Sequence, residues 1–152
     1  STGLRFFTVY GPAGRPDMAY FGFTDRLLRG DTIRIFNHGD CLRDFTYIDD
    51  IVDGIVRIIK RQEIVREETA GVPATLYNIG HGSPVQLMDF IRLLEQNLGK
   101  KAVKEFTDMQ PGDVHRTWAD TTRMEQDYGY TPSTSLEQGI EQFIEWFKTY
   151  NQ

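Results

Sequence analysis

Arg43 is the residue whose type and position in this sequence most directly suggest chemistry. It comes just before a short aromatic and β-branched run, residues 45–48, which gives way at Asp49 to apolar residues at helical spacing. A guanidinium presents a fixed fork of N–H donors that fits phosphate or carboxylate oxygens. The more ordinary use of an arginine at a helix entrance is an ion pair with a nearby carboxylate, here Asp44 or Asp49. Spacing alone favours the ion pair.

Three further side chains stand where loops and strand ends commonly carry binding groups. Arg15 lies in a loop with two glycines and two prolines, and Asp113 lies in the irregular segment 109–114. Thr8 is near the end of an apolar, strand-like run, and its hydroxyl can both donate and accept a hydrogen bond. Taken alone, each has a structural explanation: a solvated loop cation, an aspartate that caps a turn, and ordinary β-propensity.

The sequence contains no complete catalytic or metal-binding set. A lysine four residues after a tyrosine, the spacing that would lower the pKa of the phenol, follows none of Tyr10, Tyr20, Tyr47, Tyr77, Tyr128 and Tyr130. The Gly-x-Gly at residues 80–82 lacks the third glycine of a dinucleotide fingerprint, because Val85 occupies that position. The three histidines are far apart, and Cys41 is the only cysteine. We therefore predict no catalytic residue, no metal site and no internal disulfide in this chain.

Composition places the chain among globular proteins rather than nucleic-acid or membrane proteins. Its 152 residues, 39% hydrophobic and 26% charged, are enough for one domain with its own core. A net charge of −5 argues against nucleic-acid binding, which usually needs a basic patch. The sequence has no apolar run of about 18 residues and no signal-peptide pattern. Together with the lone cysteine, these features predict a reduced compartment, the cytoplasm.

Short strands alternating with helices would position the candidate residues. Strands are predicted by β-branched and aromatic runs, the first of them largely buried, at residues 4–10, 32–36, 76–80 and 102–106. Helices are predicted by apolar residues at helical spacing, at residues 17–29, 49–61, 83–98, 121–128 and 135–150. Residues 62–74, which mix charge with glycine and proline, are predicted to be a surface connection.

Two of the predicted helix starts have the pattern of a capping box. Ser83 and Gln86 have the spacing of the first box. The second box would begin at Thr134 or Ser135 and end at Glu137 or Gln138. Both patterns predict where a helix begins.

Five segments of the sequence together resemble one enzyme family. They are RFFTVYGP (residues 5–12), GRPDMA (14–19), RDFTYIDDIVDGI (43–55), YNIG (77–80) and QPGDV (110–114). In this order they resemble the C-terminal part of extended short-chain dehydrogenase/reductases that act on nucleotide sugars, and the closest subfamily is the UDP-glucuronate 4-epimerases. The resemblance covers nearly the whole chain.

The resemblance implies an α/β fold, namely the C-terminal substrate-binding portion of an extended, Rossmann-like enzyme with short mixed strands and about five helices. Residues 1–152 would form a single substrate-binding domain, with residues 1–12 as the last-strand region beside an NAD-binding domain. In the family that other domain carries the Gly-rich loop, a Ser/Thr and a Tyr-x-x-x-Lys pair. These groups would lie before Ser1, so the resemblance implies that the N-terminal Rossmann half is absent from this chain.

The implied reaction is the interconversion of UDP-glucuronate and UDP-galacturonate through a 4-keto intermediate, with NAD as cofactor. This chain would supply the UDP-sugar-binding half of such an isomerase and would be inactive alone. Alternatives are a fragment of a UDP-glucuronate decarboxylase or of a nucleotide-sugar 4,6-dehydratase, or a non-catalytic nucleotide-binding module. The intact enzyme would be a homodimer, whereas this chain, without the half that forms family dimers, could be a monomer.

The resemblance also assigns substrate-binding roles to residues already singled out. Arg43 would contact the phosphates of the nucleotide, and Arg15 would contact the phosphates or the glucuronate. Thr8 would touch the sugar or its carboxylate, and Asp113 would accept hydrogen bonds from ribose hydroxyls.

Further positions would complete the site. Ile35 and Phe36 would present backbone groups and apolar surface to the uracil, although a place in a core strand also explains them. Gln110 stands where many relatives have an arginine. Arg43 and Arg15 would therefore supply more of the positive charge that binds the phosphates. Backbone groups of Phe6 and Val9 would face the nicotinamide of NAD.

Overall fold

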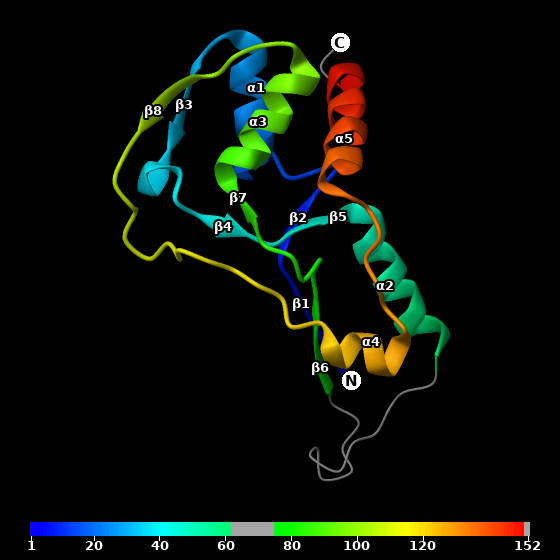
Figure 1. The fold of residues 1–152 in the computed structure, drawn as a ribbon. Coiled ribbons are helices and arrows are strands. Elements are labelled where there is room, and N and C mark those ends of the chain that lie inside the picture. The colour runs from blue at the N-terminus through cyan, green and yellow to red at the C-terminus, as the bar shows by residue number, and fades with distance from the viewer. Residues whose placement is uncertain (62–74, 151–152) are drawn as a thin grey trace.

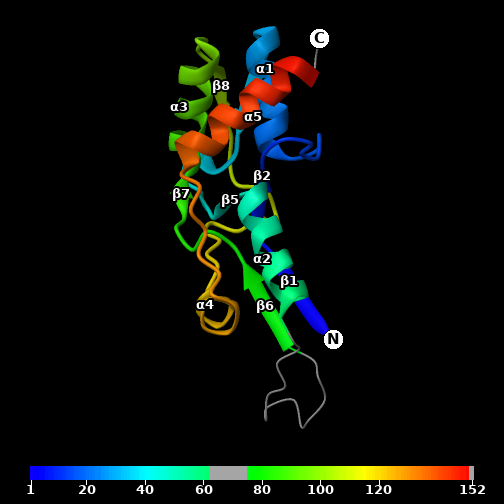
Figure 2. The ribbon, with the colours of Figure 1, turned by 90° about the vertical axis from the view of Figure 1, so that its right-hand side faces the viewer.

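Helices gather at the two ends of the molecule. The computed structural model describes residues 1–61 and 75–150. At one end lie three helices, α1 (Ala19–Arg29), α3 (Leu87–Leu98) and α5 (Leu136–Tyr150) (Figure 1). At the other end, α2 (Ile48–Lys60) and α4 (Thr122–Tyr128) lie beside strand β6 (Thr75–Ile79) (Figure 1 and Figure 2). Within the described ranges the structure thus has five α-helices, as predicted.

The strands pair two by two between distant parts of the chain. Three pairs are parallel: β1 (Thr2–Phe6) with β6, β2 (Thr8–Tyr10) with β5 (Phe45–Tyr47), and β3 (Thr32–Ile35) with β8 (Val103–Phe106). One pair, β4 (Leu42–Arg43) with β7 (Val85–Gln86), is antiparallel. A short 3-10 helix, η1 (Phe36–Gly39), follows β3. The prediction of short mixed strands is therefore confirmed.

Helix α5 begins where its capping pattern predicts. The Gln138 N–H donates to Ser135 Oγ at 3.2 Å, and the Ser135 N–H donates to Gln138 Oε1 at 3.2 Å. These two bonds satisfy backbone donors that the start of a helix leaves free. The helix then buries Ile140, Phe143 and Phe147 against α1 and α3. Both its predicted start and its predicted apolar face are confirmed.

The main core joins these three helices to β2 and β5. Tyr10 is 1% exposed, and its ring meets those of Tyr20, Phe45 and Phe90 edge to face, with centroids 6.3, 6.1 and 5.8 Å away. Phe45 in turn stacks on Phe90 of α3 at 4.2 Å. Such aromatic pairs add to the stabilisation that apolar burial provides. An aromatic core therefore holds the strand that carries Thr8.

A second, smaller core fills the other end of the molecule. It consists of buried residues from α2, β6, α4 and the segment after α4: Ile51, Tyr77, Ile79, Met124, Tyr128 and Tyr130. The Tyr77 hydroxyl donates to Asp127 Oδ2 at 2.7 Å, and the Tyr130 hydroxyl donates to Gly80 O at 3.1 Å. Burial and the bond to Asp127 raise the pKa of Tyr77. These hydroxyls therefore act as neutral hydrogen-bond donors within the core.

The predicted buried strand at residues 4–10 is wrong in two respects. It is two strands, because the chain changes partner at Phe7, whose N–H bonds to β6, while the Thr8 N–H donates to Asp44 O at 3.1 Å. It is also mostly unburied, since Tyr10 is its only buried residue. Which strand a segment pairs with depends on where other parts of the chain lie in the fold. The residue types of the segment itself do not contain that information.

The predicted capping box at Ser83 is also wrong. Residues 85–86 form β7 instead, and α3 begins at Leu87, whose N–H donates to Cys41 O at 2.9 Å. Pairing with β4 gives these backbone groups tertiary partners in place of a capping side chain. The predicted end of this helix at residue 98 is confirmed, since Gly99 follows with φ of 63° in the left-handed region and caps the helix.

Smaller differences affect the ends of other elements. Helix α1 begins at Ala19 rather than at residue 17, and β3 ends at Ile35 because Phe36 already belongs to η1. The surface connection predicted at residues 62–74 lies outside the described residues.

Glu95 ties α3 to the chain that follows it. Its carboxylate is buried and accepts the Ala102 N–H at 2.9 Å and a bond from Lys101 at 3.4 Å, with Lys104 as a second ammonium partner. Burial alone would raise the pKa of Glu95, but the bonds from Lys104 and Ala102 outweigh it and hold the pKa below its usual value. Such a group stabilises the fold above its unfolded pKa, and this contribution is lost as the pH falls through the folded pKa.

We expect Glu95→Gln to lower the free energy of unfolding by about 1–3 kcal/mol at neutral pH, because the Ala102 N–H and the Lys104 ammonium lose a buried, charged acceptor. The deficit should shrink as the pH falls from about 4.5, the usual pKa of the unfolded side chain, because the unfolded wild-type chain then binds a proton that the folded carboxylate, with its lowered pKa, does not yet bind. It should be smallest once the pH has fallen through the lowered pKa of the folded protein. Urea unfolding of both proteins across this pH range measures the difference.

The matched control is Glu105→Gln on β8. Glu105 is 52% exposed and pairs with Arg34 at 3.2 Å, so its loss should change stability by less than about 0.5 kcal/mol. A Glu95→Gln deficit that is the same at every pH would contradict the role given to this carboxylate.

Candidate functional site

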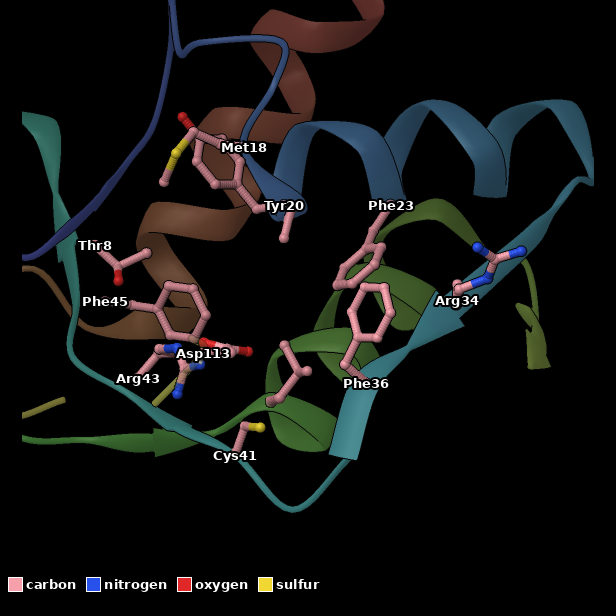
Figure 3. Close-up of a pocket in the computed structure, with 12 residues that line it drawn as sticks. Thr8, Met18, Tyr20, Phe23, Arg34, Phe36, Cys41, Arg43, Phe45 and Asp113 are labelled. Carbon is pink, nitrogen blue, oxygen red and sulfur yellow. Dashed lines mark hydrogen bonds and ion pairs between the residues drawn. The ribbon is translucent and has the colours of Figure 1, made fainter. Parts of the chain in front are cut away.

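A cavity of about 220 Å³ opens where α1, η1, β4 and β5 come together (Figure 3). Four residues singled out in the sequence line it, namely Thr8, Phe36, Arg43 and Asp113. The rest of the lining consists of Met18, Ala19, Tyr20, Phe23, Arg34, Cys41, Phe45 and Leu87. We refer to it as the first cavity. The fold thus gathers in one place candidate residues from distant parts of the sequence.

Arg43 is held in a defined orientation in this cavity. Its Nη2 donates to Asp113 Oδ1 at 2.8 Å, and its Nη1 donates to two backbone carbonyls at 3.0 and 3.3 Å. The side chain is only 17% exposed. The ion pair that spacing favours, with Asp44 or Asp49, is wrong, because the carboxylate partner is Asp113. The guanidinium of Arg43, on strand β4, is therefore oriented by Asp113 of a distant loop.

Asp113 also closes the turn on which it stands. Its Oδ1 accepts the Val114 N–H at 2.8 Å, and its own N–H donates to Gln110 O at 3.1 Å. Gly112 gives the turn its left-handed residue, with φ of 85°. The structural explanation of Asp113 as a turn residue is therefore confirmed. The same carboxylate places a negative charge beside Arg43.

Polar and aromatic side chains lie at both sides of the first cavity (Figure 3). Thr8, Arg43 and Asp113 lie at one side with the ring of Phe45, and the rings of Phe23 and Phe36 lie at the opposite side, where Arg34 also lies. A concave, mostly apolar site with a few convergent polar groups is the usual form of a small-molecule site. This arrangement can hold a flat ring against aromatic side chains while the guanidinium meets an anion.

A second cavity, of about 390 Å³, adjoins the first. The two cavities share Met18 and Tyr20 in their linings. Three more residues singled out in the sequence, Phe6, Val9 and Arg15, line the second cavity. The candidate residues are therefore divided between two neighbouring hollows.

Arg15 forms a two-bond ion pair with Asp17. Its Nε lies 3.0 Å from Asp17 Oδ1, and its Nη2 lies 2.5 Å from Asp17 Oδ2. The bond from Arg15 lowers the pKa of the Asp17 carboxyl, which stays ionised. Both side chains are exposed, at 75% and 64%, so the pair contributes little to stability. Arg15 is thus a surface cation that is paired with Asp17.

The loop that carries Arg15 packs tightly on the start of α2. Gly11 has φ of 139°, and a Cβ at this position would lie 2.6 Å from Ile48 Cγ2. Only glycine accepts both this conformation and this close approach. The contact fixes the point where the loop leaves β2 and forms part of the wall of the second cavity.

Two predicted site residues line neither cavity. Ile35 is fully buried, and its carbonyl accepts the Thr107 N–H at 2.9 Å. Gln110 is exposed on the loop that carries Asp113. The place of Ile35 in a core strand is confirmed, whereas a ligand contact of either residue stays a prediction.

Signs of other kinds of site are not found in the described part of the chain. Residues 1–61 and 75–150 contain no group of three or more His, Cys, Asp or Glu side chains placed to hold a metal ion. Among the helices in these ranges, none is long and apolar enough to cross a membrane. Cys41 is a free, buried thiol.

The model of the NAD dependent epimerase/dehydratase family matches residues 1–80, just over half of the chain. The chain belongs to this family. The matched part includes β1, β2, α1, β4 and β5, so it carries most of the lining of both cavities.

Relatives in this family match almost the whole chain. Protein CapI from Staphylococcus aureus is 44% identical over 159 aligned residues, which cover 99% of this chain and 48% of that protein. UDP-glucuronate 4-epimerase 4 from Arabidopsis thaliana is 46% identical, with 98% of this chain and 36% of that protein covered. The chain spans less than half the length of these relatives.

Solved structures of the epimerase/dehydratase family have the same fold. The crystal structure of UDP-glucuronic acid 4-epimerase from Bacillus cereus, in complex with UDP-glucuronic acid and NAD, superimposes with a TM-score of 0.86 at 35% identity. The match covers 97% of this chain and 45% of that one. The predicted family and the predicted α/β fold of an extended, Rossmann-like enzyme are therefore confirmed.

Most residues that line the first cavity do not stand out in the sequence, although some of them follow a recognisable spacing. Cys41, Arg43 and Phe45 alternate along an extended segment, and all three line the cavity. Tyr20 and Phe23 are three residues apart on α1, the spacing of one helix face. Both patterns predict a shared face, but neither indicates that the face borders a cavity.

Because Asp113 is bonded to Arg43, an anion that enters the first cavity must displace or share that contact. We expect Asp113→Asn to bind inorganic pyrophosphate about threefold to tenfold more tightly than the wild type, the range that a partly exposed ion pair allows. Asparagine keeps an acceptor for the Val114 N–H and so preserves the turn. Isothermal titration calorimetry measures both affinities.

Asp108→Asn is the control, since it removes the same charge from the same loop. Asp108 is 99% exposed and pairs with His38 at 3.2 Å, so this change should alter the pyrophosphate affinity by less than about twofold. Equal gains in the two variants would indicate a general charge effect and would contradict direct competition for Arg43.

Proposed function

We propose that this chain forms the UDP-sugar-binding half of an NAD-dependent nucleotide-sugar 4-epimerase. The intact enzyme would interconvert UDP-glucuronate and UDP-galacturonate through a 4-keto intermediate. The proposal rests on the meeting of Arg43, Asp113 and Thr8 beside aromatic rings in one cavity, next to a second cavity. Identity of 46% to a UDP-glucuronate 4-epimerase supports the choice of sugar.

Arg43 is the residue proposed to hold the diphosphate. Its bonds to two carbonyls and to Asp113 orient the guanidinium before a ligand arrives. A nucleotide phosphate would replace the carboxylate on Nη2, with a charge-assisted bond of the same kind. Arg15 would supply a second cation by sharing its bond to Asp17. Gln110 can add only an uncharged hydrogen bond.

The nucleoside and the sugar would lie on either side of the phosphates. Once Arg43 has a phosphate partner, the Asp113 carboxylate can accept hydrogen bonds from the ribose hydroxyls. Phe36 offers its ring to the uracil, and the buried Ile35 can add only backbone groups. Thr8 lines the first cavity while its chain neighbours line the second, which suits a contact with the sugar or its carboxylate.

The second cavity is the part of this chain proposed to meet NAD. Phe6 and Val9 give it strand backbone and apolar side chains, which suit a flat nicotinamide ring. The sequence has no Gly-rich pyrophosphate loop, so these residues fit only the nicotinamide end of the cofactor. When bound, NAD+ supplies the acceptor for a hydride from the sugar. The part of Thr8 would be to orient the sugar toward this cavity.

The domain assignment belongs to the same proposal. Residues 1–152 would act as one substrate-binding domain, with residues 1–12 beside an NAD-binding domain. Exposure of Phe6 and Leu76, at 49% and 45%, on the paired strands β1 and β6 supports this, because parallel strands are normally covered on both faces. The intact enzyme would be a cytoplasmic homodimer.

Titration with UDP tests the phosphate site. We expect the wild-type chain to bind UDP, and Arg43→Ala to bind it about 10- to 100-fold more weakly, because a charge-assisted hydrogen bond is lost. Arg92→Ala is the matched control: Arg92 is exposed on α3, pairs with Asp89 at 3.0 Å and lines neither cavity. Wild-type affinity in Arg43→Ala would overturn the role given to this arginine.

The 152-residue chain should not turn over UDP-glucuronate with added NAD+, because its sequence has no Tyr-x-x-x-Lys pair and no Gly-rich loop. NMR of the sugar before and after incubation measures this. Epimerisation by the chain alone would overturn the proposal that it is the binding half.

The same NMR analysis of the full-length protein that contains this chain separates the alternatives. Inversion at the sugar C4 is the expected result. Loss of CO2 would favour a decarboxylase, and loss of water would favour a 4,6-dehydratase. UDP binding without any turnover would favour a non-catalytic nucleotide-binding module.

A further inference from the structure

Asp44 is a fully buried carboxylate beside the first cavity. It lies between Arg43 of β4 and Phe45 of β5, and its exposure is 0%. An ionised carboxylate is costly to bury unless hydrogen bonds replace its water. The N–H groups that donate these hydrogen bonds identify the segments that the Asp44 side chain holds in place.

The side chain of Asp44 binds two segments that are distant in the sequence. Its Oδ1 accepts the His81 N–H at 2.9 Å. Its Oδ2 accepts the N–H groups of Gly82 and Ala119 at 3.0 and 2.8 Å. Bonds to a charged acceptor are roughly twice as strong as bonds between neutral groups. The carboxylate therefore joins the turn after β6 to the end of the loop that carries Asp113.

The backbone around Asp44 fastens further segments. Its N–H donates to Thr117 Oγ1 at 3.2 Å, and its carbonyl accepts the Thr8 N–H at 3.1 Å. Two positions earlier, the Leu42 N–H donates to His115 O at 3.0 Å, and Leu42 O accepts the Thr117 N–H at 3.1 Å. Residues 42–44 thus bind both β2 and the loop after β8.

The packing around the carboxylate leaves little room for another arrangement. A Cβ at Gly80 would lie 2.4 Å from Ala119 Cβ and 3.3 Å from Asp44 Oδ2. The turn and the loop end are therefore pressed together around the carboxylate. A change in its hydrogen bonding must move at least one of these segments.

We propose that Asp44 is the positioning residue of the nucleoside-diphosphate site, which sets the placement of Arg43 relative to Thr8 and Asp113. Arg43 is its chain neighbour, Thr8 bonds to its carbonyl, and the loop of Asp113 ends at the bonded Ala119. The identity of the ligand, a UDP-sugar, rests on the proposed function. The geometric role of Asp44 does not.

Asp44→Asn is the test variant, because the amide NH2 of asparagine would face backbone donors in place of one carboxylate oxygen. Asp50→Asn is the matched control. Asp50 is also a buried carboxylate, 7% exposed, and accepts the N–H groups of Ser133 and Thr134 at 3.1 and 3.2 Å. It lines neither cavity. Both variants should lose thermal stability.

The two variants and the wild-type chain are compared at a temperature where all are folded. For Asp44→Asn we expect UDP affinity to fall by about tenfold or more, and the three amides bonded to the carboxylate to exchange hydrogen faster. The NMR signal of the Arg43 guanidinium should shift as well. For Asp50→Asn we expect unchanged UDP affinity and an unchanged Arg43 signal, with faster exchange at residues 133 and 134.

Wild-type UDP affinity and an unmoved Arg43 signal in Asp44→Asn would overturn the proposal and leave Asp44 with a purely stabilising role. If the wild-type chain itself does not bind UDP, the proposed function fails, and the Arg43 signal in the two variants still decides the role of Asp44. Should Asp44→Asn not fold, Thr117→Val removes only the acceptor of the Asp44 N–H. It should weaken UDP binding by about twofold to fivefold, and unchanged affinity would overturn the proposal.

Discussion

A buried negative charge needs hydrogen-bond donors, and the donors that meet Asp44 come from segments far apart in the sequence. Satisfying this one carboxylate brings the turn after β6 and the end of the loop after β8 against β4 and β5. The backbone carbonyl of Asp44 accepts the Thr8 N–H at the point where the N-terminal segment stops pairing with β6 and begins to pair with β5. Both cavities border this junction, since Thr8 lines one and Val9 lines the other.

Stability and geometry have different sources in this molecule. The two apolar cores at opposite ends stabilise the fold by burial, which has no preferred direction. The placement of the site residues depends instead on directional bonds of loops and strand ends, such as the three donors on Asp44 and the contact between Arg43 and Asp113. A change in the polar junction can therefore alter the site while the helices around it stay packed.

Sequence patterns succeeded where local contacts decide the structure. The capping box at Ser135 was predicted correctly because both of its partners lie within one helical turn. The same pattern at Ser83 misled, since β4 binds the backbone there instead. The bond between Arg43 and Asp113 joins residues 70 positions apart, which no periodicity connects. Family resemblance named both as site residues, but only the fold shows that they bind each other.

The loop between β8 and α4 is fastened at both ends and irregular between them. Thr107 bonds to the backbone of Ile35 at one end, and Ala119 bonds to Asp44 at the other. Gln110 and Asp113 stand in the span between. Substitutions there can change the charge and shape offered to a ligand without loosening either end. A protein built in this way can acquire a preference for another ligand through one loop, while the rest of its fold stays as it is.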